Sequence, residues 1–129
     1  MKNKHVMLID DNRFTLNIVG KALEMNGFPT RKFNDPKEAV AAYDPQIIAV
    51  VVTDYLMPSL NGLEVMHQIR QQKSDADIIV YSGIPNEEMI QIVKENNAHF
   101  FDKPLNFELL IKKIENIFAK NKEEKCVGN

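Results

Sequence analysis

Short apolar runs that each stop at polar side chains are the feature of this sequence that most constrains its fold. Segments with apolar residues at helical spacing separate the runs, and this alternation predicts βαβ units in a mainly parallel sheet. In such a sheet, ligands bind outside the carboxyl ends of the strands. The pattern therefore predicts that three carboxylates, a hydroxyl and an ammonium meet at one edge. The runs are Val6 to Ile9 before Asp10 and Asp11, Ile47 to Val52 before Asp54, Ile78 to Val80 before Ser82, and Phe100-Phe101 before Lys103.

Length and composition indicate one ordinary globular domain. The chain has 129 residues, 44% of them hydrophobic and 26% charged, and a net charge of -2 gives no general reason to bind nucleic acid or anionic lipid. No apolar stretch approaches the roughly 20 residues needed to cross a bilayer, and the N-terminus lacks a signal-peptide core. We therefore expect a cytoplasmic protein. The single cysteine, Cys126, excludes an intramolecular disulfide and a cysteine-based metal site.

Local signals predict about five strands and five helices. Leu16, Val19 and Leu23 repeat at helical spacing before Asn26-Gly27, which predicts a helix from about Arg13 to Met25. Asp35-Pro36 indicates a capped helix start, and the continuously apolar run from Ile47 to Val52 is typical of a central strand. Three more helices are predicted around residues 63–69, 89–93 and 110–118, the last behind an Asn106 cap.

The C-terminal residues differ in composition from the rest of the chain. After Lys120 the sequence is polar and offers no apolar face to a partner. We therefore expect one domain over residues 1–120, followed by a polar tail or the start of a linker over residues 121–129.

The predicted cluster of charges suits phosphoryl transfer to a carboxylate. A carboxylate reacts poorly with a phosphoryl donor because two anions must approach, so a divalent cation and a fixed positive charge are needed. Asp10, Asp11 and Asp54 are candidate ligands for Mg²⁺, with Mn²⁺ as an alternative ion, and Lys103 is a candidate partner of a phosphoryl oxygen. Ser82 is a candidate donor to another phosphoryl oxygen. Asp54, which follows the most apolar strand, is the expected acceptor.

Taken together, these motifs resemble the receiver domain of two-component response regulators, similar to the single-domain chemotaxis-type regulators. The resemblance covers about Lys4 to Lys120 and is specific in the order and spacing of its pieces. It implies a flavodoxin-like doubly wound (βα)5 fold with strand order 2-1-3-4-5. The matching pieces are Leu8-Ile9-Asp10-Asp11-Asn12, Val52-Thr53-Asp54-Tyr55-Leu56-Met57-Pro58 with Asn61-Gly62, Val80-Tyr81-Ser82-Gly83, and Phe100-Phe101-Asp102-Lys103-Pro104.

The resemblance also implies a role for each matching residue. Asp54 would accept a phosphoryl group from a phosphohistidine on a sensor histidine kinase or a histidine phosphotransfer protein. Asp11, Asp54 and the backbone carbonyl of Leu56 would bind Mg²⁺, and Asp10 would assist through water. Ser82 and Lys103 would contact the phosphoryl oxygens. The Lys103-Pro104 bond is expected to be cis.

A switch of partner surface follows from the same resemblance. Ser82 would move toward the phosphoryl oxygens, and Phe100 would turn into the vacated space. This would change the surface made by the fourth helix, fifth strand and fifth helix, which would bind a downstream protein or an output domain outside this sequence. Receiver domains often pair through their last helices when phosphorylated, so a phosphorylation-dependent dimer is a further expectation. No helix-turn-helix pattern is present, and we expect no direct contact with nucleic acid or membrane.

Two apolar residues near the expected site predict a long-lived phosphoryl group. Leu56 lies two residues after the acceptor and Ile84 two residues after Ser82. Neither side chain orients an attacking water. We therefore expect slow self-dephosphorylation.

Three other functions fit parts of the pattern. A haloacid-dehalogenase-type phosphatase or phosphotransferase would use an aspartyl-phosphate intermediate, but it needs an acid two residues after the nucleophile, where this chain has Leu56. A flavodoxin-like cofactor binder would need a phosphate loop after the first strand, and none is present. A degenerate receiver that works without phosphate is disfavoured by the intact acidic pair, acceptor, hydroxyl and lysine.

Overall fold

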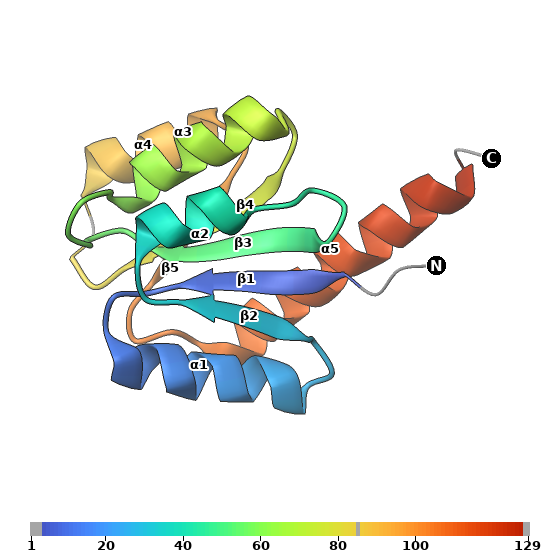
Figure 1. The fold of residues 1–129 in the computed structure, drawn as a ribbon, viewed down its shortest axis with the longest axis horizontal. Helices are drawn as coiled ribbons and strands as arrows, with labels where there is room; N and C mark the ends of the chain where they lie inside the picture. The colour runs from blue at the N-terminus through green and yellow to red at the C-terminus, as the bar shows by residue number, and fades with distance from the viewer. Residues whose placement is uncertain (1–3, 85, 128–129) are drawn as a thin grey trace.

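Five strands and five helices alternate along the chain in the computed structural model, which describes residues 4–84 and 86–127 (Figure 1). The strands form one parallel sheet in the order β2-β1-β3-β4-β5. The predicted flavodoxin-like fold and strand order are confirmed. The elements are β1 (His5–Ile9), α1 (Arg13–Met25), β2 (Thr30–Phe33), α2 (Pro36–Ala42), β3 (Ile48–Asp54), α3 (Gly62–Gln72), β4 (Asp77–Ser82), α4 (Glu87–Glu95), β5 (His99–Asp102) and α5 (Phe107–Val127).

Helices cover both faces of the sheet. Figure 1 shows α2, α3 and α4 on one face and α1 with α5 on the other. The central strand β3 is buried at all seven positions because side chains on both of its faces meet helices. This explains why its sequence is continuously apolar up to Thr53.

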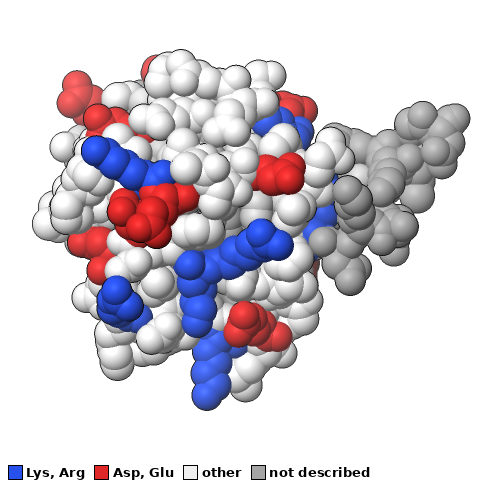
Figure 2. Space-filling model, viewed as in Figure 1, with Lys and Arg blue, Asp and Glu red and all other residues white. Residues whose placement is uncertain are grey.

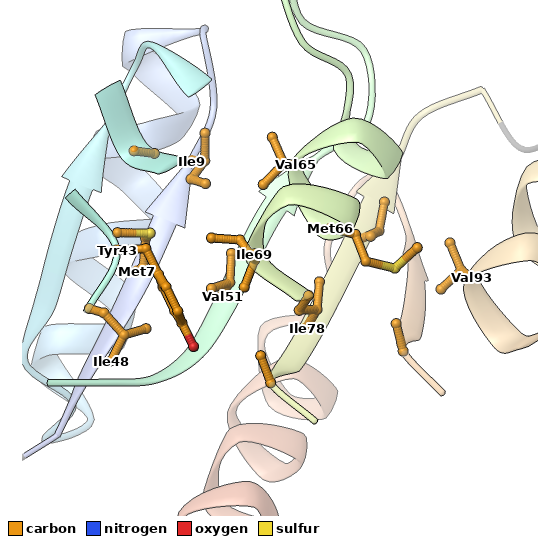
Figure 3. Close-up of a cluster of buried hydrophobic side chains, with 14 of the residues drawn as sticks. Met7, Ile9, Tyr43, Ile48, Val51, Val65, Met66, Ile69, Ile78 and Val93 are labelled. Atoms are coloured by element: carbon orange, nitrogen blue, oxygen red, sulfur yellow. The ribbon is translucent and has the colours of Figure 1, made fainter. Parts of the chain in front are cut away.

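Each face has its own apolar core. Under α2, α3 and α4, strand residues such as Met7, Val51 and Ile78 pack with Val65 and Ile69 of α3 (Figure 3). Burial of one such side chain stabilises the fold by about 1.5 to 3 kcal/mol. On the other face, strand residues pack with α1 and α5 in a second cluster: Val6, Leu8, Val50, Val52, Ile79 and Tyr81 from the sheet, and Leu16, Val19, Leu23, Leu110, Ile114 and Ile117 from the helices.

Side-chain caps set where the helices begin. Asn12 accepts a hydrogen bond from the Thr15 N–H, so that α1 begins at Arg13 as predicted. Asp35 accepts one from the Lys37 N–H with proline at the next position, which confirms the predicted start of α2. Asn106 accepts one from the Leu109 N–H ahead of α5, also as predicted.

The last helix is longer than the sequence pattern indicated. We expected a polar tail after Lys120, but α5 continues to Val127. The residues from 121 to 125 are mostly lysine and glutamate, which are good helix formers and need no apolar partner to continue a helix. The expected polar tail is therefore helical as far as Val127. A domain boundary near residue 120 stays a prediction, and residues 1–3 and 128–129 of the predicted segments lie outside the described residues.

The surface shown in Figure 2 carries acidic and basic side chains interspersed among uncharged ones, with no extended field of one sign on that face.

Within residues 4–84 and 86–127, no helix combines the length and apolarity that crossing a bilayer requires.

Candidate functional site

Three aspartates converge at the carboxyl edge of the sheet. Asp10 and Asp11 directly follow β1, and Asp54 is the last residue of β3, the neighbouring strand. One carboxylate oxygen from each of the three lies within 4.8 Å of the others. Asp10 is fully buried and Asp54 is 5% exposed, whereas Asp11 is exposed. The site therefore has two acids in the protein interior and one at its opening toward solvent.

An ammonium group lies between the two buried acids. Lys103 Nζ donates to Asp54 Oδ2 at 3.2 Å and lies 3.9 Å from Asp10 Oδ2. The other oxygen of Asp54, Oδ1, accepts the Tyr55 N–H at 2.8 Å. The backbone N–H of Lys103 donates to the Ser82 carbonyl, which extends the pairing of β5 with β4 up to the lysine. The sheet itself thus places Lys103 beside Asp54.

Burial, followed by the nearby Asp10 carboxylate, raises the pKa of Asp54 to about 6, although Lys103 acts in the opposite direction. Near neutral pH the Asp54 carboxylate therefore binds a proton more readily than that of an ordinary aspartate. A bound cation would favour its ionised form. Cation binding at this cluster and the ionisation of Asp54 would therefore depend on each other.

The loop of residues 55–61, which follows Asp54, is anchored at its far end by Asn61 and Gly62. The Gly62 N–H donates to the Tyr55 carbonyl at 2.8 Å. A Cβ atom at position 62 would lie 2.8 Å from the Asp54 carbonyl oxygen, so only glycine allows this close approach. Asn61 and Glu64 form a reciprocal capping box at the start of α3. Helix α3 is thereby fixed against the backbone of Asp54 and Tyr55.

The remaining predicted residues lie on or next to β3, β4 and β5. Ser82 is the last residue of β4, and its hydroxyl exchanges hydrogen bonds with the backbone of Ile84, at 3.2 Å from the N–H and 3.3 Å to the carbonyl. Phe100 of β5 is half-buried and packs against the core under α4. The side chains of Leu56 and Ile84 are 54% and 68% exposed. The Lys103-Pro104 bond is cis, which confirms the expectation from the resemblance.

The structure thus brings Asp10, Asp11, Asp54 and Lys103 into direct proximity. Ser82 lies at the same edge, but the hydrogen bonds of its hydroxyl among the described residues are to Ile84. Phe100 packs against the apolar core under α2, α3 and α4. The roles of acceptor, switch and lifetime control remain predictions for these residues.

One residue of the site was not singled out from the sequence. Tyr81, one position before Ser82, is fully buried, and its hydroxyl donates to Asp10 Oδ2 at 2.6 Å. A tyrosine in an apolar strand is a recognisable signal, because a buried phenol nearly always requires a hydrogen-bond partner. The sequence does not say which of the three aspartates supplies that partner.

Comparisons with known proteins identify the family. The model of the response regulator receiver domain matches residues 6–115. Among curated relatives, the C4-dicarboxylate transport transcriptional regulatory protein DctD of Rhizobium meliloti is 28% identical over 93% of this chain and 25% of its own length. The hybrid signal transduction histidine kinase C of Dictyostelium discoideum is 28% identical over 90% of this chain and 10% of its own length. The chain therefore spans less than half of the length of these relatives.

Solved structures show the same fold. A response regulator receiver domain protein from Clostridium thermocellum superposes with a TM-score of 0.87 at 22% identity, over 92% of this chain and 97% of that one. The residues matched by the family model run from β1 to beyond β5, and they therefore include Asp10, Asp11, Asp54 and Lys103. This chain belongs to the response regulator receiver domain family.

Proposed function

We propose that this domain accepts a phosphoryl group on Asp54 in a Mg²⁺-dependent reaction and thereby switches a partner-binding surface. The observation that carries the proposal is the position of Lys103, whose ammonium donates to Asp54 Oδ2 and lies between two buried carboxylates. A buried acid with an ammonium on one oxygen and further acids alongside is suited to receive a phosphoryl group, because the charge of the added oxygens meets a cation already in place.

The donor would be a phosphohistidine on a sensor histidine kinase or a phosphotransfer protein. An Asp54 carboxylate oxygen attacks the phosphorus, the O–P bond forms as the P–N bond to the imidazole breaks, and the leaving nitrogen keeps the electron pair and takes up a proton. Lys103 stabilises charge on a phosphoryl oxygen during this transfer. The chemistry is limited to the domain's own phosphorylation and dephosphorylation, so its role is signalling and it does not turn over a separate substrate.

The residues of the acidic cluster fit a magnesium ion. Three carboxylate oxygens within 4.8 Å of one another are the hard oxygen ligands that Mg²⁺ prefers, and Mn²⁺ is bound by similar groups. Asp11 and Asp54, with the backbone carbonyl of Leu56, would hold the ion, and Asp10 would act on it through water. When bound, the cation neutralises negative charge on the phosphoryl group and on the acids.

The switch would begin at Ser82. In the present state its hydroxyl is occupied by the backbone of Ile84, and a phosphoryl oxygen on Asp54 would compete for it. Movement of Ser82 would open space toward Phe100, whose ring is half-buried and has no hydroxyl to hold it in either state. The change would alter the surface of α4, β5 and α5, which would bind a downstream protein or an output domain, or pair with a second phosphorylated copy.

The phosphoryl group would be long-lived. Leu56 and Ile84 are both largely exposed beside the site, and neither side chain carries a polar group to orient water for attack on phosphorus. We expect replacement of Leu56 by Asn and Ile84 by Glu to shorten the half-life of phospho-Asp54, measured as loss of mass after removal of the donor. A longer half-life in these variants would contradict the assignment of Leu56 and Ile84.

Intact mass after incubation with acetyl phosphate and Mg²⁺ tests the main proposal. Wild type is expected to gain one phosphoryl group, and Asp54→Asn none. Asp75→Asn is the matched control, because Asp75 is an exposed aspartate that pairs with Lys73 on the surface. It should be phosphorylated like wild type.

The same measurement distinguishes the competing functions. No gain by wild type, with acetyl phosphate and again with a phosphohistidine donor, would favour a receiver that works without phosphate. Continuous release of phosphate from an added phosphomonoester would favour an enzyme of the haloacid-dehalogenase type. The exposed, apolar Leu56 at the position of that family's acid speaks against the second outcome.

A further inference from the structure

The side chain of Tyr81 reaches across the sheet to the acidic site. Tyr81 lies on β4 directly beside Asp54 of β3 in the strand register, and its carbonyl accepts the Tyr55 N–H at 2.9 Å. Its hydroxyl reaches past β3 to Asp10, which follows β1. One fully buried residue therefore contacts the acceptor strand through its backbone and a second acid through its side chain.

Both oxygens of Asp10 are held by specific donors. Oδ1 accepts the Asn12 N–H at 2.9 Å, and Oδ2 accepts the Tyr81 hydroxyl at 2.6 Å. The Lys103 ammonium is 3.9 Å from Oδ2, too far to replace the hydroxyl as a donor. The short O–H···O distance is that of a charge-assisted bond to a carboxylate. Rotation of the buried Asp10 carboxylate would therefore break the bond to Tyr81.

The direction of this bond follows from the chemistry of the two groups. The Tyr81 hydroxyl donates and Asp10 Oδ2 accepts, because a phenol keeps its proton near neutral pH and an ionised carboxylate only accepts. The Lys103 ammonium also lies 5.2 Å from the centre of the Tyr81 ring, within the range of a cation–π contact. Tyr81 thus contacts two charged groups of the site at once.

We infer that Tyr81 is a positioning residue of the phosphoacceptor site, which holds the Asp10 carboxylate in the orientation used when Mg²⁺ binds. This inference rests on the proposed function, because it assigns Asp10 to the ion. Hydrogen-bond partners of metal-binding carboxylates restrict ligand orientation, and their loss typically weakens metal affinity by about tenfold or more. A purely structural tyrosine would affect unfolding but not affinity for the ion.

Calorimetric titration of the intact chain with Mg²⁺ tests this inference. Tyr81→Phe removes one hydroxyl and keeps the ring beneath Lys103, and we expect its dissociation constant for Mg²⁺ to rise about tenfold. Tyr43→Phe is the matched control: Tyr43 is also a buried tyrosine, but it lies in the other core, near Met7 and Ile48 (Figure 3). Its removal should leave the affinity at the wild-type value.

A double-mutant cycle distinguishes a positioning role of Tyr81 from a general loss of structure. If Tyr81 acts through Asp10, Tyr81→Phe should produce little further loss of affinity in an Asp10→Asn background. Equal losses in both backgrounds would overturn the inference, as would a Tyr81→Phe protein that binds Mg²⁺ like wild type. Wild type that binds no Mg²⁺ would overturn the proposed function and this inference together. In the metal-free protein, a downfield hydroxyl proton that disappears in both Tyr81→Phe and Asp10→Asn is expected in the NMR spectrum.

Discussion

The middles and the carboxyl ends of the same three strands differ sharply in chemistry. In the middle, β1, β3 and β4 carry apolar side chains that are almost completely buried. At the ends, the next residues are Asp10, Asp54 and Ser82, which are equally buried but polar. Burial of an apolar group stabilises the fold, whereas burial of a carboxylate costs free energy that its partners only partly return. One sheet therefore combines a stabilising interior with a reactive edge.

The difference teaches that stability and function are separated along the strand axis. Substitutions in the middle should lower stability, whereas substitution of Asp54 should raise it and, under the proposed function, prevent phosphorylation. Changes in stability of opposite sign at positions a few residues apart are expected where a functional site is retained although it lowers stability.

The largest effect is expected in the middle of β1. Leu8 is fully buried in the cluster that faces α1 and α5, and Leu8→Ala should lower the free energy of unfolding by about 3 kcal/mol through lost burial and a remaining cavity. Urea unfolding followed by circular dichroism measures the change. Leu8→Met keeps most of the volume and should cost less than about 1.5 kcal/mol. Equal losses from both variants would mean that volume is not what Leu8 contributes.

At the edge, Asp54→Asn should stabilise the protein by on the order of 1 to 3 kcal/mol at pH 7 in a chelator. The pKa of Asp54 is raised from 3.8 to about 6 in the folded state, mainly by burial. The folded protein therefore binds this proton more tightly than the unfolded chain, and wild-type stability falls as pH rises through this interval. Below the unfolded value the advantage of the variant should disappear. Thermal unfolding between pH 3.5 and pH 8 checks the sign, and a variant less stable than wild type at pH 7 would contradict it.

The start of α3, which follows the loop of residues 55–61, should show an intermediate effect on stability. Asn61→Ala removes the side-chain oxygen that accepts the Glu64 N–H but keeps the backbone N–H of residue 61 that donates to Glu64, and it should lower the free energy of unfolding by about 1 kcal/mol. Asn116→Ala, an exposed position inside α5, is the control and should not destabilise the fold. If the two variants are equally stable, the cap does not hold α3 in place.

The smallest effect is expected for a charge far from the edge. Asp75 pairs with Lys73 at 2.7 Å, but its side chain is 83% exposed. Asp75→Ala should change the free energy of unfolding by less than about 0.5 kcal/mol because solvent screens the pair. A larger loss, measured by urea unfolding at low and high salt, would show that exposed charges matter here as much as buried ones.

Much of this fold was predictable because its signals are local. The spacing of Leu16, Val19 and Leu23 gave the bounds of α1, and Asp35-Pro36 gave the start of α2. The grouping of the aspartates with Lys103 followed from the rule that the carboxyl ends of parallel strands share one edge.

Other features depend on contacts between distant residues and left no local signal. The need for glycine at position 62 comes from the carbonyl of Asp54, and the partner of the Tyr81 hydroxyl comes from another strand. The spacing of apolar residues does not indicate the continuation of α5 to Val127, because this last part of the helix has high helix propensity but no apolar face in its sequence.

The wide sequence separation within the site has a consequence for a chain still being made. Lys103 and Asp54 are 49 residues apart, and Tyr81 and Asp10 are 71 apart. A nascent chain that ended after α4 would contain all three aspartates and Tyr81 but would lack the ammonium that follows β5. Its acidic groups would face one another without their cation. Under the proposed function, the ammonium that would stabilise a phosphoryl oxygen is therefore in place only once the fifth strand has joined the sheet.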